Sequence, residues 1–310
     1  MQRFDIAFVG HMCFDETVPY AGASSPPPEP HIAPGSAVLC GSMAAAHVGK
    51  NVAVVTKMAK ADDHILRPMR DAGITVFHIP AEHTSYMRVV HPSEDADDRR
   101  MFLKHNAGFI TIDEMPDVPC ARMHLAGISD REFTLGLIRT LAGRGHNLSC
   151  DMQSFVRRVD DATQAVHFKR VQNAREIASL MRRVKLDVVE AKLTTGHADL
   201  ELAARMYEGW GCSEVVITDS RGILVRGHGK TLFEPFSNAS SIGRTGRGDT
   251  AFAAYLSWRI DHTVAESLRF AASLVSIKME SHGPFHATLS DVLARMALYH
   301  AHRGPQRSKG

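Results

Sequence analysis

The chain of 310 residues carries a formal net charge of +2, with 44% hydrophobic and 23% charged residues. This balance is typical of a soluble globular protein and gives no electrostatic reason to expect a nucleic-acid or membrane partner. No apolar run approaches the roughly 20 residues that span a bilayer. The five cysteines form no C-x-x-C pair, and no cleavable apolar segment comes before FDIAFVG. We therefore expect a cytoplasmic protein with reduced cysteines.

Short β-branched runs alternate with longer helical patterns along the chain. In chain order, strands are predicted at 5–9, 52–56, 75–79, 123–125, 147–150, 186–189 and 215–218. Helices are predicted at 37–48, 62–71, 131–142, 174–184, 199–210, 249–260, 264–279 and 289–300. The strands are apolar on both faces, as in a sheet that helices cover on each side. The alternation therefore predicts an α/β fold with a parallel sheet and right-handed crossovers.

Two segments interrupt this alternation. Residues 22–34 are rich in proline and cannot form a helix or a central strand. Residues 84–104 read as two polar strands joined by an acidic turn, which is the pattern of a hairpin with one solvated face. We interpret them as a flap over the strand ends, where open α/β sheets bind ligands. The alternative is two surface excursions without a role in binding.

Two glycine motifs that would indicate a nucleotide site are incomplete. RGHGKT at 226–231 resembles the end of a P-loop, but Leu224 stands where that motif needs a glycine. We expect this stretch to turn a hairpin between ILVRG and TLFEPF instead. No G-x-G-x-x-G follows the first strand, so the sequence argues against an NAD-type oxidoreductase.

The stretch GRTGRGDTAF at 243–252 places glycines and a carboxylate directly before an apolar helix. If Asp249 begins that helix, the backbone N–H groups of Gly246, Arg247 and Gly248 are unpaired and form an anion site with the helix dipole. A carboxylate beside such a site suits phosphoryl transfer, because it can accept the proton of an attacking hydroxyl. The alternative is a capped helix after a turn, with no ligand.

The same stretch resembles the C-terminal signature D-T-x-G-A-G-D-x-F of the PfkB (ribokinase-like) carbohydrate kinases. The matching residues are Thr245, Gly246, Gly248, Asp249 and Phe252. Further segments resemble the family in the same order, at 34–49, 84–104 with the following NAGFIT, 186–196 and 216–225. The resemblance covers nearly the whole chain. It implies one ribokinase-like domain over 1–310, a three-layer sandwich with a central, mostly parallel sheet and a small β lid at about 12–34 and 80–108.

The resemblance also implies an ATP- and Mg²⁺-dependent kinase that phosphorylates a hydroxyl of a small sugar, an inositol-like polyol or a nucleoside. Asp249 would be the general base, and the backbone amides of Gly246, Arg247 and Gly248 would form the anion hole. Contacts to the acceptor are implied for Asp15, Gly35, Ser36 and Cys40. Contacts to the nucleotide are implied for Asp187, Thr218, Gly222 and Thr245. Glu190 would help to hold Mg²⁺ through water.

Several of these residues have a plain structural alternative. Asp15 could cap a turn, Glu190 could be an exposed helix residue, and Thr218 could only end a strand. A different class of function also stays open, since a degenerate member of the family could bind a sugar or nucleotide as a sensor without catalysis.

The departures from the signature concern the anion site and the acceptor site. Gly243 stands at the position of an aspartate that supports a monovalent-cation site in the family. We hypothesise that Arg244 or Arg247 supplies the positive charge instead; the alternative is that both face solvent. Ser36 and Cys40 replace a glycine and an asparagine that read sugar hydroxyls, and Cys40 lacks the asparagine's amide donor and acceptor. The G-[GS]-A-V pattern at 35–38 and the ending SIKMESHGPF resemble inositol- and nucleoside-type members more than ribokinase.

We expect a small-molecule acceptor and ATP as partners, without nucleic acid or membrane. A homodimer through the lids would cover the exposed face of the lid sheet. The prolines of 22–34 are expected to prevent the usual lid strand there, which leaves the oligomeric state open.

Overall fold

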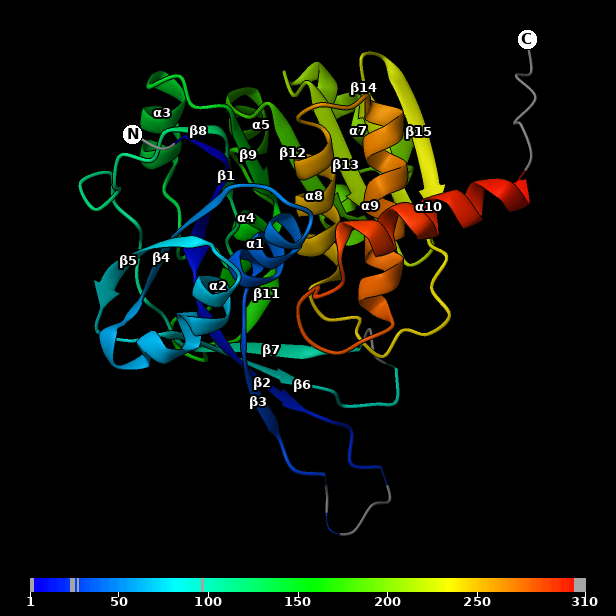
Figure 1. The fold of residues 1–310 in the computed structure, drawn as a ribbon. Helices are drawn as coiled ribbons and strands as arrows, with labels where there is room; N and C mark the ends of the chain where they lie inside the picture. Colours follow the sequence, from blue (N-terminus) through cyan, green and yellow to red (C-terminus); the bar gives the residue numbers. More distant parts are fainter. Residues whose placement is uncertain (1–2, 23–25, 27, 96–97, 304–310) are drawn as a thin grey trace.

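The computed structural model describes residues 3–303 apart from 23–25, 27 and 96–97. The described residues form a central sheet of nine strands (Figure 1). Across the sheet the strands are β15 (Lys230–Pro235), β14 (Gly222–Gly227), β13 (Glu214–Thr218), β12 (Arg183–Asp187), β9 (Leu148–Asp151), β8 (Cys120–Leu125), β1 (Phe4–His11), β4 (Val52–Ala59) and β5 (Thr75–Ala81). All neighbours from β13 to β5 pair in parallel, whereas β14 and β15 pair antiparallel at one edge.

Alternation of side chains along the strands places a hydrophobic core on each face of the sheet. In β1, Ile6 and Phe8 point into one core, whereas Ala7 and Val9 point into the other. The first core is covered by α1 (Ala37–His47), α2 (Arg67–Asp71), α8 (Arg247–Trp258), α9 (Val264–Met279) and α10 (Leu289–Arg303). The second is covered by α3 (Leu135–Gly143), α5 (Ala174–Leu180), α6 (Val188–Thr195) and α7 (Leu200–Gly209). The predicted three-layer α/β fold is therefore confirmed.

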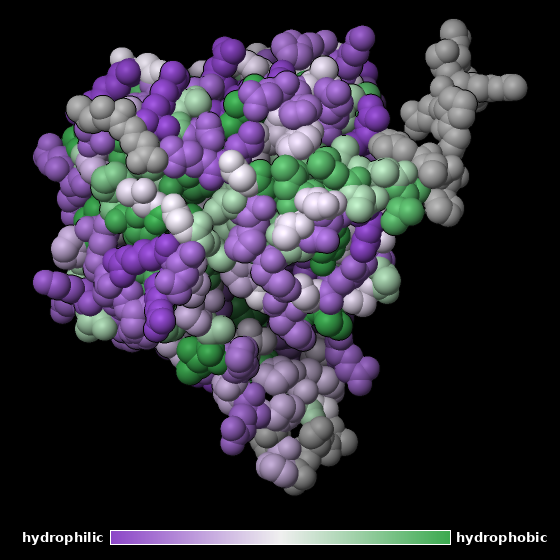
Figure 2. Space-filling view, in the orientation of Figure 1, coloured by the Kyte–Doolittle hydropathy of each residue, from purple (hydrophilic) through white to green (hydrophobic). Residues whose placement is uncertain are grey.

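A second, four-stranded sheet projects from the carboxyl end of β1 (Figure 1). Its order is β3 (His31–Gly35), β2 (Cys13–Val18), β6 (Ser85–Val90) and β7 (Arg100–His105). A short hairpin of β10 (Arg157–Val159) and β11 (Val166–Phe168) adjoins it, where the Leu103 N–H donates to the Gln164 carbonyl at 2.9 Å. Figure 2 shows this lid projecting from the body, with polar residues spread over both. The predicted hairpin of β6 and β7 is confirmed.

The expectation that the prolines prevent a lid strand is wrong for the end of the proline-rich segment. Residues His31–Gly35 form β3, which pairs antiparallel with β2 and places Pro34 opposite Phe14. Because β3 is the edge strand of the lid, a proline there can leave its missing N–H on the unpaired side. The hairpin predicted between ILVRG and TLFEPF is confirmed as β14 and β15, with His228 and Gly229 at positive φ in the turn.

Two predicted boundaries near the functional residues are wrong. Helix α5 ends at Leu180, and the strand predicted at 186–189 is β12, which begins at Arg183. The alternating Arg183 and Lys185 resemble a solvated helix face, but both side chains are buried against carboxylates. Helix α8 begins at Arg247 rather than at Asp249, because Gly246 forms the N-cap. No helix of the described residues is long and apolar enough to cross a membrane.

One buried carboxylate joins α8 to the sheet and so helps to position the helix that carries Asp249. Glu214 of β13 accepts hydrogen bonds from Arg183 Nε at 2.9 Å, from the Tyr255 hydroxyl at 2.7 Å and from Arg259 Nε at 3.1 Å. The two guanidinium groups depend on this carboxylate for neutralisation, since ionised groups that are out of water need a partner.

We predict that Glu214→Ala lowers the free energy of unfolding by about 3–5 kcal/mol, because it leaves buried guanidinium groups unpaired. Urea denaturation measures the change. The control Glu201→Ala removes an exposed ion pair with Arg205 and should cost less than about 1 kcal/mol. Equal losses in the two variants would contradict the role given to Glu214.

Candidate active site

The residues that the sequence singled out gather at the carboxyl edge of the parallel sheet, below which the lid begins. Strand β1 runs into β2, β9 ends at Asp151, β12 ends at Asp187, and β13 ends at Thr218. The N-terminus of α8 lies at the same edge, because Gly248 packs next to Lys185 of β12 and Thr218 of β13. Open α/β sheets bind their ligands at this edge.

The start of α8 offers backbone donors. Gly246 is the N-cap, with φ of 75° in the left-handed region that glycine adopts without strain. Within the described part of the chain, the N–H groups of Gly246, Gly248 and Asp249 have no protein acceptor. The Arg247 N–H was predicted to be unpaired, but it donates a hydrogen bond to the Arg244 carbonyl at 3.2 Å within the turn. The unpaired donors at this helix end are therefore the backbone N–H groups of Gly246, Gly248 and Asp249, an arrangement that can bind an anion.

Both glycines of this loop are required by close neighbours. A Cβ on Gly246 would lie 2.5 Å from Cys40 Sγ, and a Cβ on Gly248 would lie 2.9 Å from Lys185 Nζ. Cys40 is buried and packs under the loop, and burial raises the pKa of its thiol to about 12. The cysteine that replaces the expected asparagine thus supports the anion site as an uncharged group.

The carboxylate of Asp249 lies in the first turn of α8 and is held from another element. Its Oδ1 accepts a hydrogen bond from Gln153 Nε2 at 3.1 Å, and the same Nε2 donates to the Gly127 carbonyl at 2.9 Å. Gln153 begins the single-turn helix α4 (Gln153–Val156) directly after β9. The sequence reasoning missed Gln153; the only available signal was its place two residues after the end of a buried strand.

A buried cluster of opposite charges lies behind the anion site. Lys185 Nζ lies 2.8 Å from Asp151 Oδ2 and 3.9 Å from Glu190 Oε2. Burial disfavours the ammonium, but the surrounding carboxylates outweigh it and raise the pKa of Lys185 above its ordinary value. Sequence reasoning missed Lys185 and Asp151, because a charged residue in an apolar strand shows its partners only after folding.

Asp187 and Glu190 form a capping box at the start of α6. The Asp187 N–H donates to Glu190 Oε2 at 2.7 Å, and the Glu190 N–H donates to Asp187 Oδ1 at 2.8 Å. Glu190 is fully buried, so the alternative of an exposed helix residue is wrong. Its Oε1 is buried without a hydrogen-bond partner among the described residues. Burial raises the pKa of Glu190 to about 8, which Lys185 partly opposes.

This orphaned oxygen fits a hydrated divalent cation. Among the described residues, no group of three or more His, Cys, Asp or Glu side chains could hold a metal by itself. Mg²⁺ does not need such a group, since it keeps several waters and binds through one or two carboxylates together with substrate phosphates. Glu190, whose Oε1 has no partner among the described residues, is the available carboxylate, whereas Asp151 Oδ2 is already paired with Lys185 at 2.8 Å.

The predicted acceptor residues lie at the base of the lid. A Cβ on Gly35 would overlap the Asp15 carboxylate, so glycine is required where β3 passes Asp15. Burial raises the pKa of Asp15 to about 6; a hydrogen bond from Cys13 opposes this, and the charge of Asp249 adds to it. The charges of Asp15 and Asp249 therefore interact. Ser36 has φ of 142°, and its hydroxyl accepts the Leu39 N–H at 3.1 Å as the N-cap of α1, which leaves only its backbone for a ligand.

Three residues predicted to contact the nucleotide lie at different places in the fold. Thr218 is buried at the end of β13, behind Gly248. Thr245 is part of the loop before α8, and its carbonyl accepts a hydrogen bond from Lys278 Nζ. Gly222 is buried inside the β14–β15 hairpin, where a Cβ would overlap the Glu234 carbonyl, so packing alone explains this glycine.

Arg157 is a further residue that sequence reasoning missed. Its positive charge lowers the pKa of both Asp15 and Glu190. Its Nε is buried without a hydrogen-bond partner among the described residues, and its guanidinium carbon lies 6.0 Å from the ring centroid of Phe168. An unsatisfied guanidinium donor at this point is suited to an anionic group.

The start of α8 presents unpaired N–H groups beside an oriented carboxylate, at the carboxyl edge of a parallel sheet. This arrangement is typical of proteins that transfer phosphoryl groups. Residues 3–290 match the family described as pfkB family carbohydrate kinase. The chain belongs to this family, whose members are phosphotransferases with an alcohol group as acceptor.

Solved structures with the same fold support this assignment. A pyrophosphate-dependent kinase in the ribokinase family, complexed with a pyrophosphate analog and myo-inositol, is 25% identical with a TM-score of 0.83, over 93% of this chain and 99% of that chain. Ribokinase from Arabidopsis thaliana, complexed with ribose and ATP, is 15% identical with a TM-score of 0.75, over 95% and 99%. A nucleoside kinase from Methanocaldococcus jannaschii is 15% identical with a TM-score of 0.71, over 96% and 100%. A comparison with curated protein sequences finds no match.

The raised pKa of Glu190 predicts a pH-dependent stability. A carboxyl whose pKa is raised on folding contributes stability below its unfolded pKa and loses it as the pH rises through the folded value. Glu190→Gln cannot ionise and still accepts the Asp187 N–H. We expect this variant to exceed the wild type in free energy of unfolding by more than about 1 kcal/mol at pH 9, and to match it near pH 4. Urea denaturation at both pH values, with the exposed Glu201→Gln as control, measures this. A difference that is constant with pH would contradict it.

Proposed function

We propose that the protein transfers a phosphoryl group from ATP, with Mg²⁺, to a hydroxyl of a small cyclic polyol, sugar or nucleoside. The observation that carries this proposal is the Asp249 carboxylate, which Gln153 orients beside the unpaired N–H groups of Gly246 and Gly248. A base next to an anion site is what in-line transfer from a phosphate donor to an alcohol requires.

Each charged group has a proposed part in this transfer. Asp249 accepts the proton of the acceptor hydroxyl as the hydroxyl oxygen attacks the phosphorus. The N–H groups at the start of α8 stabilise the charge on the transferred phosphoryl oxygens. Lys185 adds positive charge directly behind Gly248. Bound Mg²⁺ would neutralise charge on the donor phosphates, and Glu190 would hold it through water together with Asp187 and the phosphates.

The acceptor is proposed to contact Asp15 through adjacent hydroxyls, since an ionised carboxylate can accept two such hydrogen bonds. The charge of Asp249 acts on Asp15, which supports an acceptor contact near the proposed base. The similar structure that contains myo-inositol supports a cyclic polyol as the acceptor class. Closure of the lid over the acceptor would exclude water and limit hydrolysis of the donor. A homodimer through the lids stays a prediction.

Pyrophosphate is a second candidate donor. Structures of pyrophosphate-dependent kinases of the ribokinase family share 25–27% identity with this chain. The basic residues Arg157, Arg244 and Arg247 would suit a donor without a nucleoside, since guanidinium groups bind phosphate bidentately. Assays of acceptor phosphorylation with ATP or pyrophosphate as sole donor, over a panel of inositols, sugars and nucleosides, distinguish the two. Donor binding without turnover of any acceptor would favour the sensor instead.

We predict that Asp249→Asn lowers kcat by at least about 10²-fold, because the amide cannot accept the hydroxyl proton. The Kd of the donor should stay within about twofold, since the backbone donors remain. Kinetics and calorimetry measure the two quantities. Asp261→Asn, at an exposed aspartate that pairs with Lys50, is the matched control. Near-normal turnover by Asp249→Asn would refute the base assignment.

The raised pKa of Asp15 predicts how acceptor binding depends on pH. Because this pKa is about 6 instead of 3.8, Asp15 takes up a proton as the pH falls through 6 and then loses part of its capacity to accept hydrogen bonds. We expect the KM of the acceptor to rise over this range in the wild type. Asp15→Asn should show a high KM at every pH, and Gly35→Ala, which displaces the Asp15 carboxylate, should resemble it. A wild-type KM that is constant from pH 8 to pH 5 would contradict the prediction.

A further inference from the structure

A lysine that no sequence motif indicated lies beside the loop that precedes α8. Lys278 belongs to the last turn of α9 and is 1% exposed. Its Nζ donates hydrogen bonds to the backbone carbonyls of Gly243 and Thr245. These two carbonyls flank the turn that leads to the N-cap Gly246, so one ammonium determines the path of the chain into the anion site.

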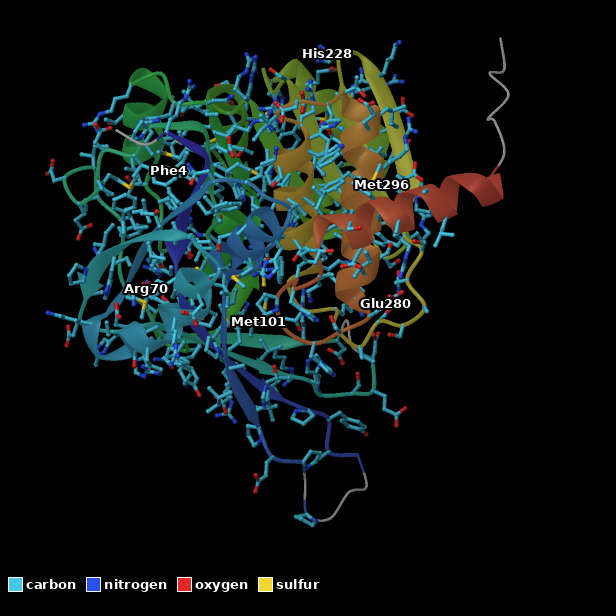
Figure 3. All side chains as sticks on the ribbon, in the orientation of Figure 1. Phe4, Arg70, Met101, His228, Glu280 and Met296 are labelled. Atoms are coloured by element: carbon cyan, nitrogen blue, oxygen red, sulfur yellow. The ribbon has the colours of Figure 1, made fainter. Side chains whose placement is uncertain are left out.

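The loop needs a positive charge at this point because it lies on the carboxyl end of a helix. The Gly243 N–H donates to the Met279 carbonyl at 2.9 Å, and a Cβ on Gly243 would overlap the Ser281 carbonyl. Figure 3 shows Glu280, directly after α9, at the end of this helix that faces the lid. Carbonyl groups of the loop and of the helix terminus converge here, and the helix dipole adds negative potential. Buried carbonyl oxygens at such a point need hydrogen-bond donors or a cation among them.

A free monovalent cation does not fit these residues. An ion at the position of the Lys278 ammonium would have the carbonyl oxygens of Gly243 and Thr245 as ligands, and both are bonded to that ammonium. An aspartate at position 243, which the resemblance associates with a cation site, is excluded by the contact with Ser281. The residues that would hold such an ion instead hold a covalently attached cation.

We propose that the Lys278 ammonium acts as a built-in monovalent cation, which fixes the loop carbonyls at 243 and 245, orients the N–H donors of α8 and makes the protein independent of K⁺. Lys278 is a positioning residue, since it acts through the loop. The effect of Lys278 on kcat rests on the proposed kinase function. The effect of Lys278 on how stability depends on K⁺ does not rest on that function.

The groups around Lys278 are compatible with a charged amine. Burial lowers the pKa of Lys278, and the neighbouring Asp249 carboxylate opposes this effect. Cys40 faces the same space, and burial keeps it protonated, with a pKa of about 12. The charge of the ammonium therefore acts on the proposed base, whereas the thiol is neutral.

The test compares full-length wild type with Lys278→Ala and Lys278→Met at constant ionic strength, in chloride salts of K⁺, NH₄⁺ and tetramethylammonium. The wild-type Tm and kcat should be the same in all salts.

In tetramethylammonium, Lys278→Ala should lose at least about tenfold in kcat. K⁺ or NH₄⁺ should restore both kcat and Tm saturably, because the space left by the side chain admits an ion. Lys278→Met should show the same loss without restoration, because its side chain fills that space.

Lys57 provides the matched control. It is largely buried, and its Nζ also donates to a backbone carbonyl, that of Phe109 at 2.9 Å, and to Glu114 at 2.7 Å. Lys57→Ala should lower the Tm without any response that distinguishes K⁺ from tetramethylammonium.

Two outcomes would overturn the proposal. One is a wild type whose Tm or kcat depends on K⁺; the other is a Lys278→Ala variant that behaves alike in all salts. The Tm measurements need no substrate, so they decide the question even if no acceptor is turned over, a result that would refute only the kinase function. If Lys278→Ala does not fold in tetramethylammonium, folding in K⁺ or NH₄⁺ supports the proposal, and failure to fold in every salt counts against it.

Discussion

The geometry of the site depends on one close contact, that between the Lys185 ammonium and the backbone of α8 at Gly248. A Cβ at position 248 would lie 2.9 Å from the Lys185 Nζ, so any larger residue there would displace this ammonium. Lys185 can be buried there because the Asp151 carboxylate pairs with its Nζ at 2.8 Å. The carboxyl ends of β9 and β12, the start of α6 and the start of α8 are thereby held at one point. The capping box of α6 and the hydrogen bond from Gln153 to Asp249 are built on this arrangement.

Two lysines approach the same loop from different layers of the fold. Lys185 comes from the sheet and lies behind Gly248, whereas Lys278 comes from α9 and binds the carbonyls before Gly246. The loop thus presents its carbonyls to Lys278 inside the protein and leaves its N–H groups available for a ligand. Separating the two kinds of backbone group in this way leaves backbone donors at the start of α8 available for an anion.

Local patterns were enough to predict part of this site. Gly246, Gly248 and Asp249 lie within a few residues of one another, and a glycine-rich turn before an apolar helix has a direct physical meaning. Gln153 could not be found in the same way, since its partner Asp249 lies 96 residues further along the chain. Lys278 lies 35 residues after Gly243, and in the sequence it reads as an ordinary charge near the end of a helix. The boundary of β12 was misjudged for a related reason, because Lys185 resembles a solvated residue until its carboxylate partners are known.

The sequence by itself determined the α/β class, the order of the strands and helices along the chain, the lid hairpin and the glycine-rich start of α8. These features follow from periodicity and from backbone preferences, which act over a few residues. Only the tertiary structure decided which charges are buried together, that one Glu190 oxygen has no partner among the described residues, and that the Lys278 ammonium binds the loop carbonyls before α8. Neutralisation of buried charge is a property of groups brought together from distant parts of the chain, so it is settled only when the sheet edge, α8 and α9 have packed.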